Sequence, residues 1–191
     1  MPVQLPLTGL SLPEPAPLAS ADLSDLWSYP DLSTQTLCTH AKLLGHAGEC
    51  LTDSLLCRFG LLTIPLPELS SADRLVLHPA RALRLQVKTT SSLRSGAWQF
   101  NIQRGYGHAP SGIRPYDAGA FDLLALVVLP ENVVRFTAEL RPRQRIAPAE
   151  IAALRANPRA SVEEALLALG LTMDLAAAPH RNERALIPPP A

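Results

Sequence analysis

Two short segments near the middle of the chain, residues 73–77 and 83–89, alternate apolar and polar side chains. Successive side chains on a β-strand point to opposite faces, so this alternation predicts two neighbouring strands. In the second segment Gln86 and Lys88 are two positions apart and share a face, while Val87 points the other way. We therefore expect a strand with polar groups on one face and apolar groups free to enter a core on the other.

The segment before these strands has the period of a helix. Apolar residues recur every three or four positions over residues 34–59, which defines one helix face. That face consists of Leu37, Ala41, Leu44, Ala47, Leu51, Leu55 and Phe59. Gly45 and Gly48 lower helix propensity inside it, so we expect either a break there or close packing against a neighbour. Gly60 supplies a C-terminal stop.

Alternating or continuous apolar runs predict four further strands, at residues 61–66, 98–102, 121–129 and 132–138. The run over 121–129 is almost entirely apolar, which is typical of an interior strand buried on both faces. Trp98 and Phe100 are expected in the core. The polar stretches 89–96 and 104–120 are predicted to be loops.

Two helices are predicted near the end of the sequence. Pro148 stands where proline is favoured, at the start of a helix. Residues 161–164 form a capping-box pattern before a second helix that ends at Leu169. The predicted organisation is an extended or disordered arm over 1–33, a core over 34–140, a C-terminal helical extension over 141–175 and a loose tail over 176–191.

Composition predicts one intracellular domain. The 191 residues are 47% hydrophobic, which suits a single well-buried core. Three irregularly spaced cysteines do not make a disulfide framework, so a reducing cytoplasm is expected. No apolar run reaches membrane-spanning length, and prolines interrupt the N-terminal segment where a signal peptide would need a continuous apolar run.

The charge distribution changes this picture. The totals balance, with 17 basic and 17 acidic residues, yet no acidic residue occurs between Asp73 and Asp117. The basic residues in that interval are Arg74, Arg81, Arg84, Lys88, Arg94, Arg104 and Arg114. A basic interval predicts an anionic partner, with the loop residues Arg94, Arg104 and Arg114 as candidate phosphate contacts. For Arg81 and Arg84 a solvated charged face is the open alternative.

The polar groups around this interval suit metal-assisted phosphodiester hydrolysis. That reaction uses a divalent cation to neutralise phosphate charge and activate water. Mg²⁺ prefers oxygen ligands, which the Asp73 carboxylate, the Gln86 amide and the Val87 carbonyl can supply. Lys88 would orient the water or stabilise charge that develops on the phosphate.

These residues resemble a known superfamily. The segment Gly45-His-Ala-Gly48-Glu49, then Asp73, then Gln86-Val-Lys88-Thr89 is similar to the PD-(D/E)xK nucleases. The resemblance is strongest to the branch with a Q-V-K motif, which includes group I intron-associated endonucleases and relatives of archaeal Holliday junction resolvases. The stretch from Tyr116 to Asp122 is also similar to that branch. The resemblance covers residues 42–138.

The resemblance implies a restriction-endonuclease-like α/β core, with a mixed central sheet flanked by helices. It also implies Mg²⁺- or Mn²⁺-dependent DNA cleavage by a homo-oligomer. Carried over residue by residue, Glu49, Asp73, Gln86 and Lys88 are the catalytic and metal-binding candidates, with Val87 as a backbone ligand. Two positions differ from the usual motif: Ala72 replaces proline, and Gln86 replaces an acidic residue, which removes one negative charge.

Other interpretations of these residues stay open. Asp73 can be a strand-edge gatekeeper, Lys88 a solvated strand residue and Glu49 a solvent-facing helix residue, while Asp122 is expected to be structural. A catalytically weak or inactive nuclease-fold protein that binds DNA or a protein partner is the second functional hypothesis. An interaction protein built on the C-terminal helices is the third.

A group of cysteines and histidines invites a zinc interpretation. The group consists of Cys38, His40, His46, Cys50 and Cys57. Its spacing matches no zinc finger or ribbon. Buried thiols on a helix are the expected account, with a zinc site as the alternative.

Overall fold

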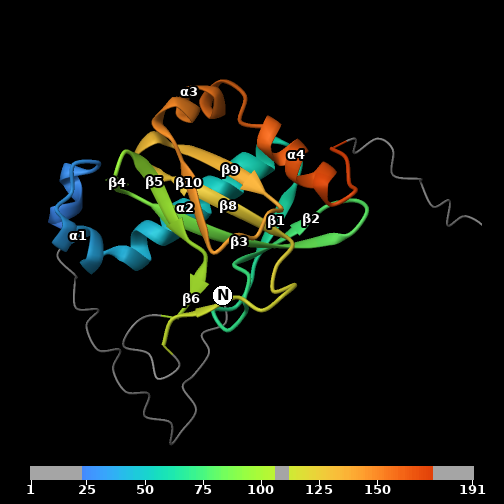
Figure 1. Cartoon of the computed structure of the whole chain (residues 1–191), viewed down its shortest axis with the longest axis horizontal. Helices are drawn as coiled ribbons and strands as arrows, with labels where there is room; N and C mark the ends of the chain where they lie inside the picture. The colour runs from blue at the N-terminus through green and yellow to red at the C-terminus, as the bar shows by residue number, and fades with distance from the viewer. Residues whose placement is uncertain (1–22, 106–111, 174–191) are drawn as a thin grey trace, which may run out of the picture.

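The computed structural model describes residues 23–105 and 112–173, and a five-stranded sheet forms its centre (Figure 1). In spatial order the strands are β1 (Leu62–Pro65), β2 (Arg74–Leu77), β3 (Ala82–Thr90), β8 (Leu123–Val128) and β9 (Val133–Thr137). Strands β3 and β8 run parallel, and the other neighbours are antiparallel. With helices packed on this sheet, the predicted α/β class and mixed central sheet are confirmed.

Two helices replace the single helix predicted over 34–59. Helix α1 (Thr34–Thr39) ends at Thr39, and α2 (Ala41–Arg58) begins after His40, which caps both helices. The break therefore precedes both glycines. Helix α2 then runs without interruption along β3 and β1. Short 3-10 helices occur at η1 (Ser24–Ser28) and η2 (Leu129–Glu131), so part of the predicted N-terminal arm is helical; residues 1–22 and 174–191 lie outside the described residues.

A second sheet was not expected from the sequence. It has the order β10-β5-β4 and consists of β4 (Leu93–Arg94), β5 (Ala97–Asn101) and β10 (Arg143–Ile146). A further pair, β6 (Gln103–Arg104) and β7 (Arg114–Pro115), follows β5. The stretches predicted as loops thus contain short strands. These strands form the crossover connection that the parallel pairing of β3 with β8 requires. Strand β10, which lies in the predicted C-terminal extension, pairs with β5.

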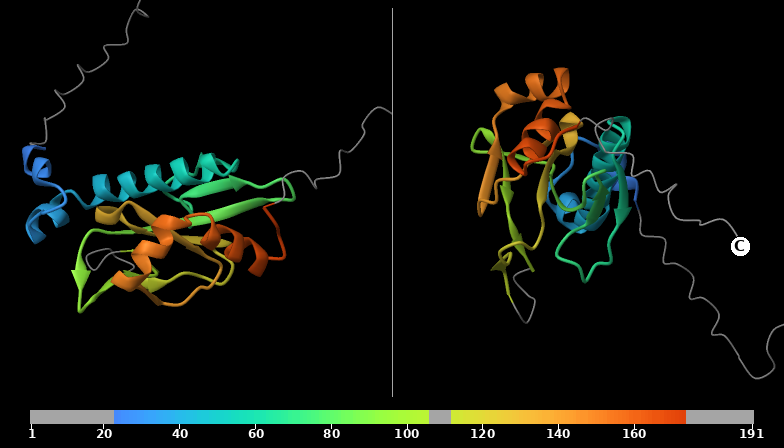
Figure 2. Two further views of the ribbon diagram at one scale, coloured as in Figure 1. Left: turned by 90° about the horizontal axis from the view of Figure 1, so that it is seen from above. Right: turned by 90° about the vertical axis from the view of Figure 1, so that its right-hand side faces the viewer.

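The alternation along β8 divides the core into two layers. Its residues Leu123, Ala125 and Val127 pack with α2 and α4 (Ala160–Ala168). The intervening residues pack with Trp98 and Phe100 of β5 and with α3 (Pro148–Ala156). Figure 2 shows α2 and the second sheet on opposite sides of the central sheet. The predictions of an interior strand at 121–129 and of core positions for both aromatic residues are confirmed.

The capping box predicted at residues 161–164 is wrong. Helix α4 begins at Ala160, and Ser161 lies inside it, with its Oγ accepting the backbone N–H of Phe136 at 3.1 Å. Strand β9 is at the edge of the sheet, so this buried N–H needs a partner outside the sheet. Pro148 does occupy the first position of α3, as predicted. Among the described residues, no helix is long and apolar enough to cross a membrane.

The two glycines of α2 have different surroundings. A Cβ atom added at Gly48 would collide with the side chain of Thr89 on β3, including Oγ1, whereas one added at Gly45 would meet nothing within 4 Å. Close packing, one of the two outcomes predicted for this pair, therefore occurs at Gly48. The contact brings α2 unusually near β3, and Glu49 is the next residue along the helix.

Alanine substitutions test this contact. We expect Gly48→Ala to lower the free energy of unfolding by about 1–3 kcal/mol, because the added methyl overpacks the interface. The matched change Gly45→Ala should raise it by about 0.5–1 kcal/mol, since alanine favours the helix and the site is open. Urea denaturation of the two variants checks both signs; equal effects would contradict the contact.

Candidate functional site

The structure brings Glu49, Asp73, Gln86 and Lys88 to one cleft of about 700 Å³. Three elements place them there: Glu49 comes from α2, Asp73 directly precedes β2, and the other two lie on β3. The antiparallel register sets Arg74 opposite Leu85, which puts Asp73 beside the start of the Gln86-Val87-Lys88 run.

Asp73 and Val87 present oxygen atoms to a shared point. The Asp73 Oδ2 atom accepts the Val87 N–H at 2.7 Å and the Gln86 Nε2–H at 2.6 Å. The same Nε2 donates to the Val87 carbonyl at 3.2 Å. The amide nitrogen thus stands between two of the proposed metal ligands. Half a turn of the amide would place Oε1 of Gln86 there instead.

Burial and charge act together on Asp73. Burial raises its pKa above the ordinary value, and the negative charge of Glu49 raises it further. The Val87 N–H, Lys88 and Arg74 oppose this rise without cancelling it. A second carboxylate in a half-buried cleft makes the ionised form of Asp73 costly, and a bound cation would relieve that cost.

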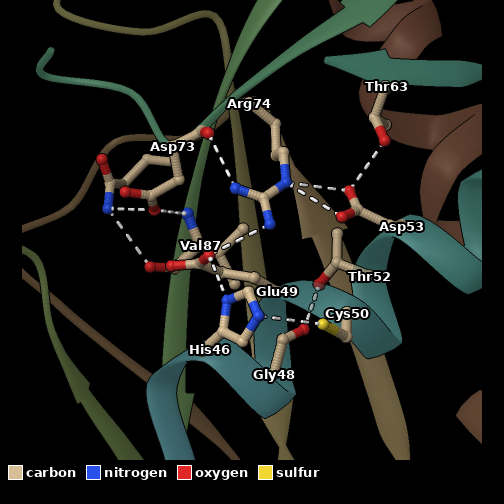
Figure 3. Close-up of polar contacts among 11 residues, drawn as sticks. His46, Gly48, Glu49, Cys50, Thr52, Asp53, Thr63, Asp73, Arg74 and Val87 are labelled. Carbon is tan, nitrogen blue, oxygen red and sulfur yellow. Dashed lines mark hydrogen bonds and ion pairs between the residues drawn. The ribbon is translucent and has the colours of Figure 1, made fainter. Parts of the chain in front are cut away.

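Arg74 is the buried centre of an ion-pair network (Figure 3). Its Nη2 lies 3.0 Å from Glu49 Oε2, and its Nε donates to Asp53 Oδ2 at 2.9 Å and to Oδ1 at 3.1 Å. Its Nη1 donates to the Asp73 carbonyl at 3.0 Å. Only 6% of Arg74 is exposed. It therefore does not belong to the basic surface that the charge pattern predicted.

Sequence reasoning missed Asp53. A signal was present, because Asp53 follows Glu49 by four residues, so a helix puts both carboxylates on one face. Thr63 of β1 donates its hydroxyl to Asp53 Oδ1 at 2.8 Å. The network thus ties α2 to both β1 and β2.

Lys88 is held by groups from the crossover. Its Nζ donates to the Tyr116 hydroxyl at 2.9 Å and to the Gln103 carbonyl at 3.1 Å. Tyr116 packs edge-on against Phe121, with ring centroids 4.9 Å apart. Sequence reasoning noted Tyr116 only as part of a similar stretch. Its contact with the lysine depends on the pairing of β6 with β7, which the sequence did not reveal.

The predicted phosphate contacts flank the site on two sides. Arg94 is exposed and lines the first cleft. Arg104 and Arg114 line a second cleft of about 470 Å³, which Asp73 and Lys88 also border. Arg114 is exposed, whereas Arg104 lies 2.9 Å from Asp117.

Arg81 and Arg84 have a structural partner. Both guanidinium groups are exposed and contact Asp122, at 3.4 and 3.3 Å, which fits the solvated alternative. The Arg84 N–H also donates to Asp122 Oδ2 at 2.8 Å. Burial would raise the pKa of Asp122, but this N–H and the two guanidinium groups together hold it below the ordinary value. The prediction that Asp122 is structural agrees with these contacts.

The prediction of buried thiols is wrong. Cys38 on α1 and both Cys50 and Cys57 on α2 are exposed. The two cysteines of α2 lie away from its buried residues Gly48, Thr52, Leu55 and Leu56. His46 lies 3.4 Å from Glu49 and 3.6 Å from the Cys50 thiol. Within residues 23–105 and 112–173, no three histidine, cysteine or acidic side chains gather closely enough to hold a metal ion.

Comparison with known proteins finds a likeness in structure but none in sequence. No protein-family model matches the sequence. No curated protein matches it either. Among solved structures, the chain is similar to a bacterial homing endonuclease. That protein, I-Ssp6803I, is 18% identical, and the match covers 56% of this chain and 77% of the other, with a TM-score of 0.49.

Two carboxyl groups should respond to pH in opposite directions. The pKa of Asp73 is raised in the folded state, so its contribution to stability is present below the unfolded-state pKa, about 3.9, and is lost as the pH rises through the folded-state pKa. In EDTA at pH 7, Asp73→Asn should therefore raise Tm, and the gain should shrink towards pH 4.

Asp122→Asn is the matched control. The folded-state pKa of Asp122 is lowered, so its stabilisation is present above the unfolded-state pKa and is lost as the pH falls through the folded-state value. This variant should lower Tm at pH 7. Calorimetric scans from pH 4 to 8 check both signs, and a destabilised Asp73→Asn protein at pH 7 would contradict the assignment.

Proposed function

We propose that the protein is a metal-dependent DNA endonuclease that hydrolyses phosphodiester bonds. The observation that carries the proposal is the convergence of the Asp73 carboxylate and the Val87 carbonyl on the Gln86 amide, in a cleft shared with Glu49 and Lys88. Oxygen ligands of this kind suit a hard divalent cation.

The residues present fit Mg²⁺ or Mn²⁺. Asp73 and Val87 would each provide one oxygen, and Gln86 would provide Oε1 once its amide has turned. The contacts of Glu49 with Arg74 and His46 both use Oε2, so Oε1 is the atom proposed for the cation. A bound cation supplies Lewis-acid stabilisation of the phosphate and lowers the pKa of attached water. The raised pKa of Asp73 supports the choice of this carboxylate as a ligand.

Lys88 is proposed to stabilise the charge that develops on the scissile phosphate. An ammonium group has three N–H donors, and two of them are directed at Tyr116 and Gln103. These contacts fix the position of the charge, and the remaining donor can reach a phosphate oxygen or the attacking water. A charge held in place before the reaction is the form of stabilisation that lowers a barrier most.

DNA is the proposed substrate because cationic side chains lie on both sides of the acidic centre. Arg94 borders one cleft, and Arg104 and Arg114 border the other. Hydroxyl side chains over residues 89–92 line the first cleft and can also donate to phosphate. One site cuts one strand, so we further propose a homo-oligomer with two-fold symmetry for duplex cleavage.

Cleavage of DNA tests the reaction. Wild-type protein should nick or linearise plasmid DNA in Mg²⁺ or Mn²⁺ and not in EDTA. Asp73→Asn and Lys88→Ala should each lower the rate by about 100-fold or more, because the first removes a proposed ligand of the cation and the second removes the ammonium proposed to stabilise charge on the phosphate.

The matched control is Arg159→Ala, which also removes one exposed positive charge, but from the start of α4. It should cut at the wild-type rate. A wild-type protein that leaves plasmid and branched DNA intact in both metals would refute the proposal, as would equal rates for wild type and both site variants.

Gln86 favours a second candidate function, a nuclease-fold protein that binds DNA or a protein partner without efficient cleavage. Its amide is neutral, only 5% exposed, and donates to the very oxygens proposed to bind the cation. The hydrogen-bonded amide can therefore stabilise a metal-free site. The strength of metal binding separates the two functions.

Calorimetric titration with Mn²⁺ measures that strength. We expect wild-type binding that Asp73→Asn abolishes, and Gln86→Glu should tighten it by about tenfold, since a carboxylate adds a negative charge where an amide stood. Binding by Gln86→Glu alone, with none by wild type, would favour the second function. Equal Mn²⁺ binding by wild type, Asp73→Asn and Gln86→Glu would show that the metal binds elsewhere, and neither candidate function could then be assigned to this cleft.

A further inference from the structure

Arg74 is the most deeply buried charged group near the candidate site, and it contacts a proposed ligand directly. Its side chain is 7% exposed, and its guanidinium lies 3.0 Å from Glu49 and 2.9 Å from Asp53. A buried arginine retains its charge and is costly to bury unless its donors are satisfied. Here three of its nitrogen atoms have partners, including the Asp73 carbonyl.

We propose that Arg74 is a positioning residue that holds Glu49 in the orientation needed for the cation. This inference rests on the proposed function. The guanidinium engages Oε2 of Glu49, which fixes the carboxylate plane and directs Oε1 as the free ligand atom. A planar, rigid donor group is better suited to this than a flexible ammonium.

The other end of the network anchors the arginine. Asp53 accepts Nε of Arg74 through both carboxylate oxygens, and Thr63 donates to the same aspartate at 2.8 Å. The order of contacts is therefore Thr63, Asp53, Arg74, Glu49, leading from β1 to the cleft. Glu49 and Asp53 are one turn apart on α2, so the arginine holds that helix face at two points.

Charge supports the same role. Glu49, Asp53 and Asp73 would crowd three negative charges around the cleft, and Arg74 offsets one of them. Asp53 does not line either cleft described above, whereas Glu49 and Asp73 line the first. Asp53 therefore supports the site through Arg74, outside the cleft, and does not compete for the cation.

A double-mutant cycle distinguishes positioning from a purely structural ion pair. Arg74→Lys keeps the positive charge and loses the planar fork, so electrostatic attraction for the cation is little changed. We expect it to weaken Mn²⁺ binding by about tenfold when Glu49 is present, and by less than about twofold in a Glu49→Gln background. The loss in Tm should appear in both backgrounds.

Thr63→Val provides a milder variant that is less exposed to failure of folding. It removes the hydroxyl that anchors Asp53 and keeps every charge of the network, and it should weaken Mn²⁺ binding by about two- to threefold. Arg84→Lys is the matched control, because Arg84 pairs with Asp122 outside the site, and its Mn²⁺ affinity should equal that of wild type.

The outcomes separate this inference from the proposed function. If wild type binds Mn²⁺ through Asp73 but Arg74→Lys and Thr63→Val bind as tightly, the positioning role is overturned and the metal site stands. Equal weakening by Arg74→Lys in both Glu49 backgrounds also overturns it, because the effect would not pass through Glu49. If wild type shows no Asp73-dependent binding, both fail.

Discussion

The close approach of helix α2 to strand β3 is the constraint on which the candidate site depends. Gly48 meets Thr89 at a distance that leaves no room for a side chain. The next residue, Glu49, is thereby brought beside Asp73, although the two are far apart in the sequence. A glycine that costs helix propensity is tolerated here because its missing side chain sets the distance between two carboxylates.

The approach of α2 to β3 brings the carboxylates of Glu49 and Asp73 together, and their repulsion is unfavourable for the folded protein. Burial and Glu49 raise the pKa of Asp73, whereas Asp122, at a comparable position before β8, has a lowered pKa. The difference lies first in burial, which is greater for Asp73, and then in their partners: Asp122 faces two guanidinium groups, and Asp73 faces a neutral amide and a second carboxylate. Functional sites commonly carry such unfavourable arrangements, which the rest of the fold must offset.

The crossover between β3 and β8 links the core to the rest of the site. Parallel strands need such a connection, and the described part of it forms the short strands β4 to β7. That crossover delivers Tyr116 and the Gln103 carbonyl to Lys88 and places Arg114 at the rim. The same segment therefore covers one layer of the core and orients the ammonium group of Lys88, which is proposed to act on phosphate.

The sequence by itself determined the elements whose residues interact locally. Alternation placed Gln86 and Lys88 on one face of β3, the apolar run identified β8 as an interior strand, and Pro148 marked the start of α3. The motif resemblance also pointed to the four residues that meet in one cleft, but their meeting depends on the packing of α2 on β3 and on the pairing of β2 with β3. Only the tertiary structure decided which charged side chains lie at the surface, where a ligand can reach them. Arg74 looked like part of a basic surface but is buried between acids, since burial and pairing depend on contacts between distant segments that no local pattern records.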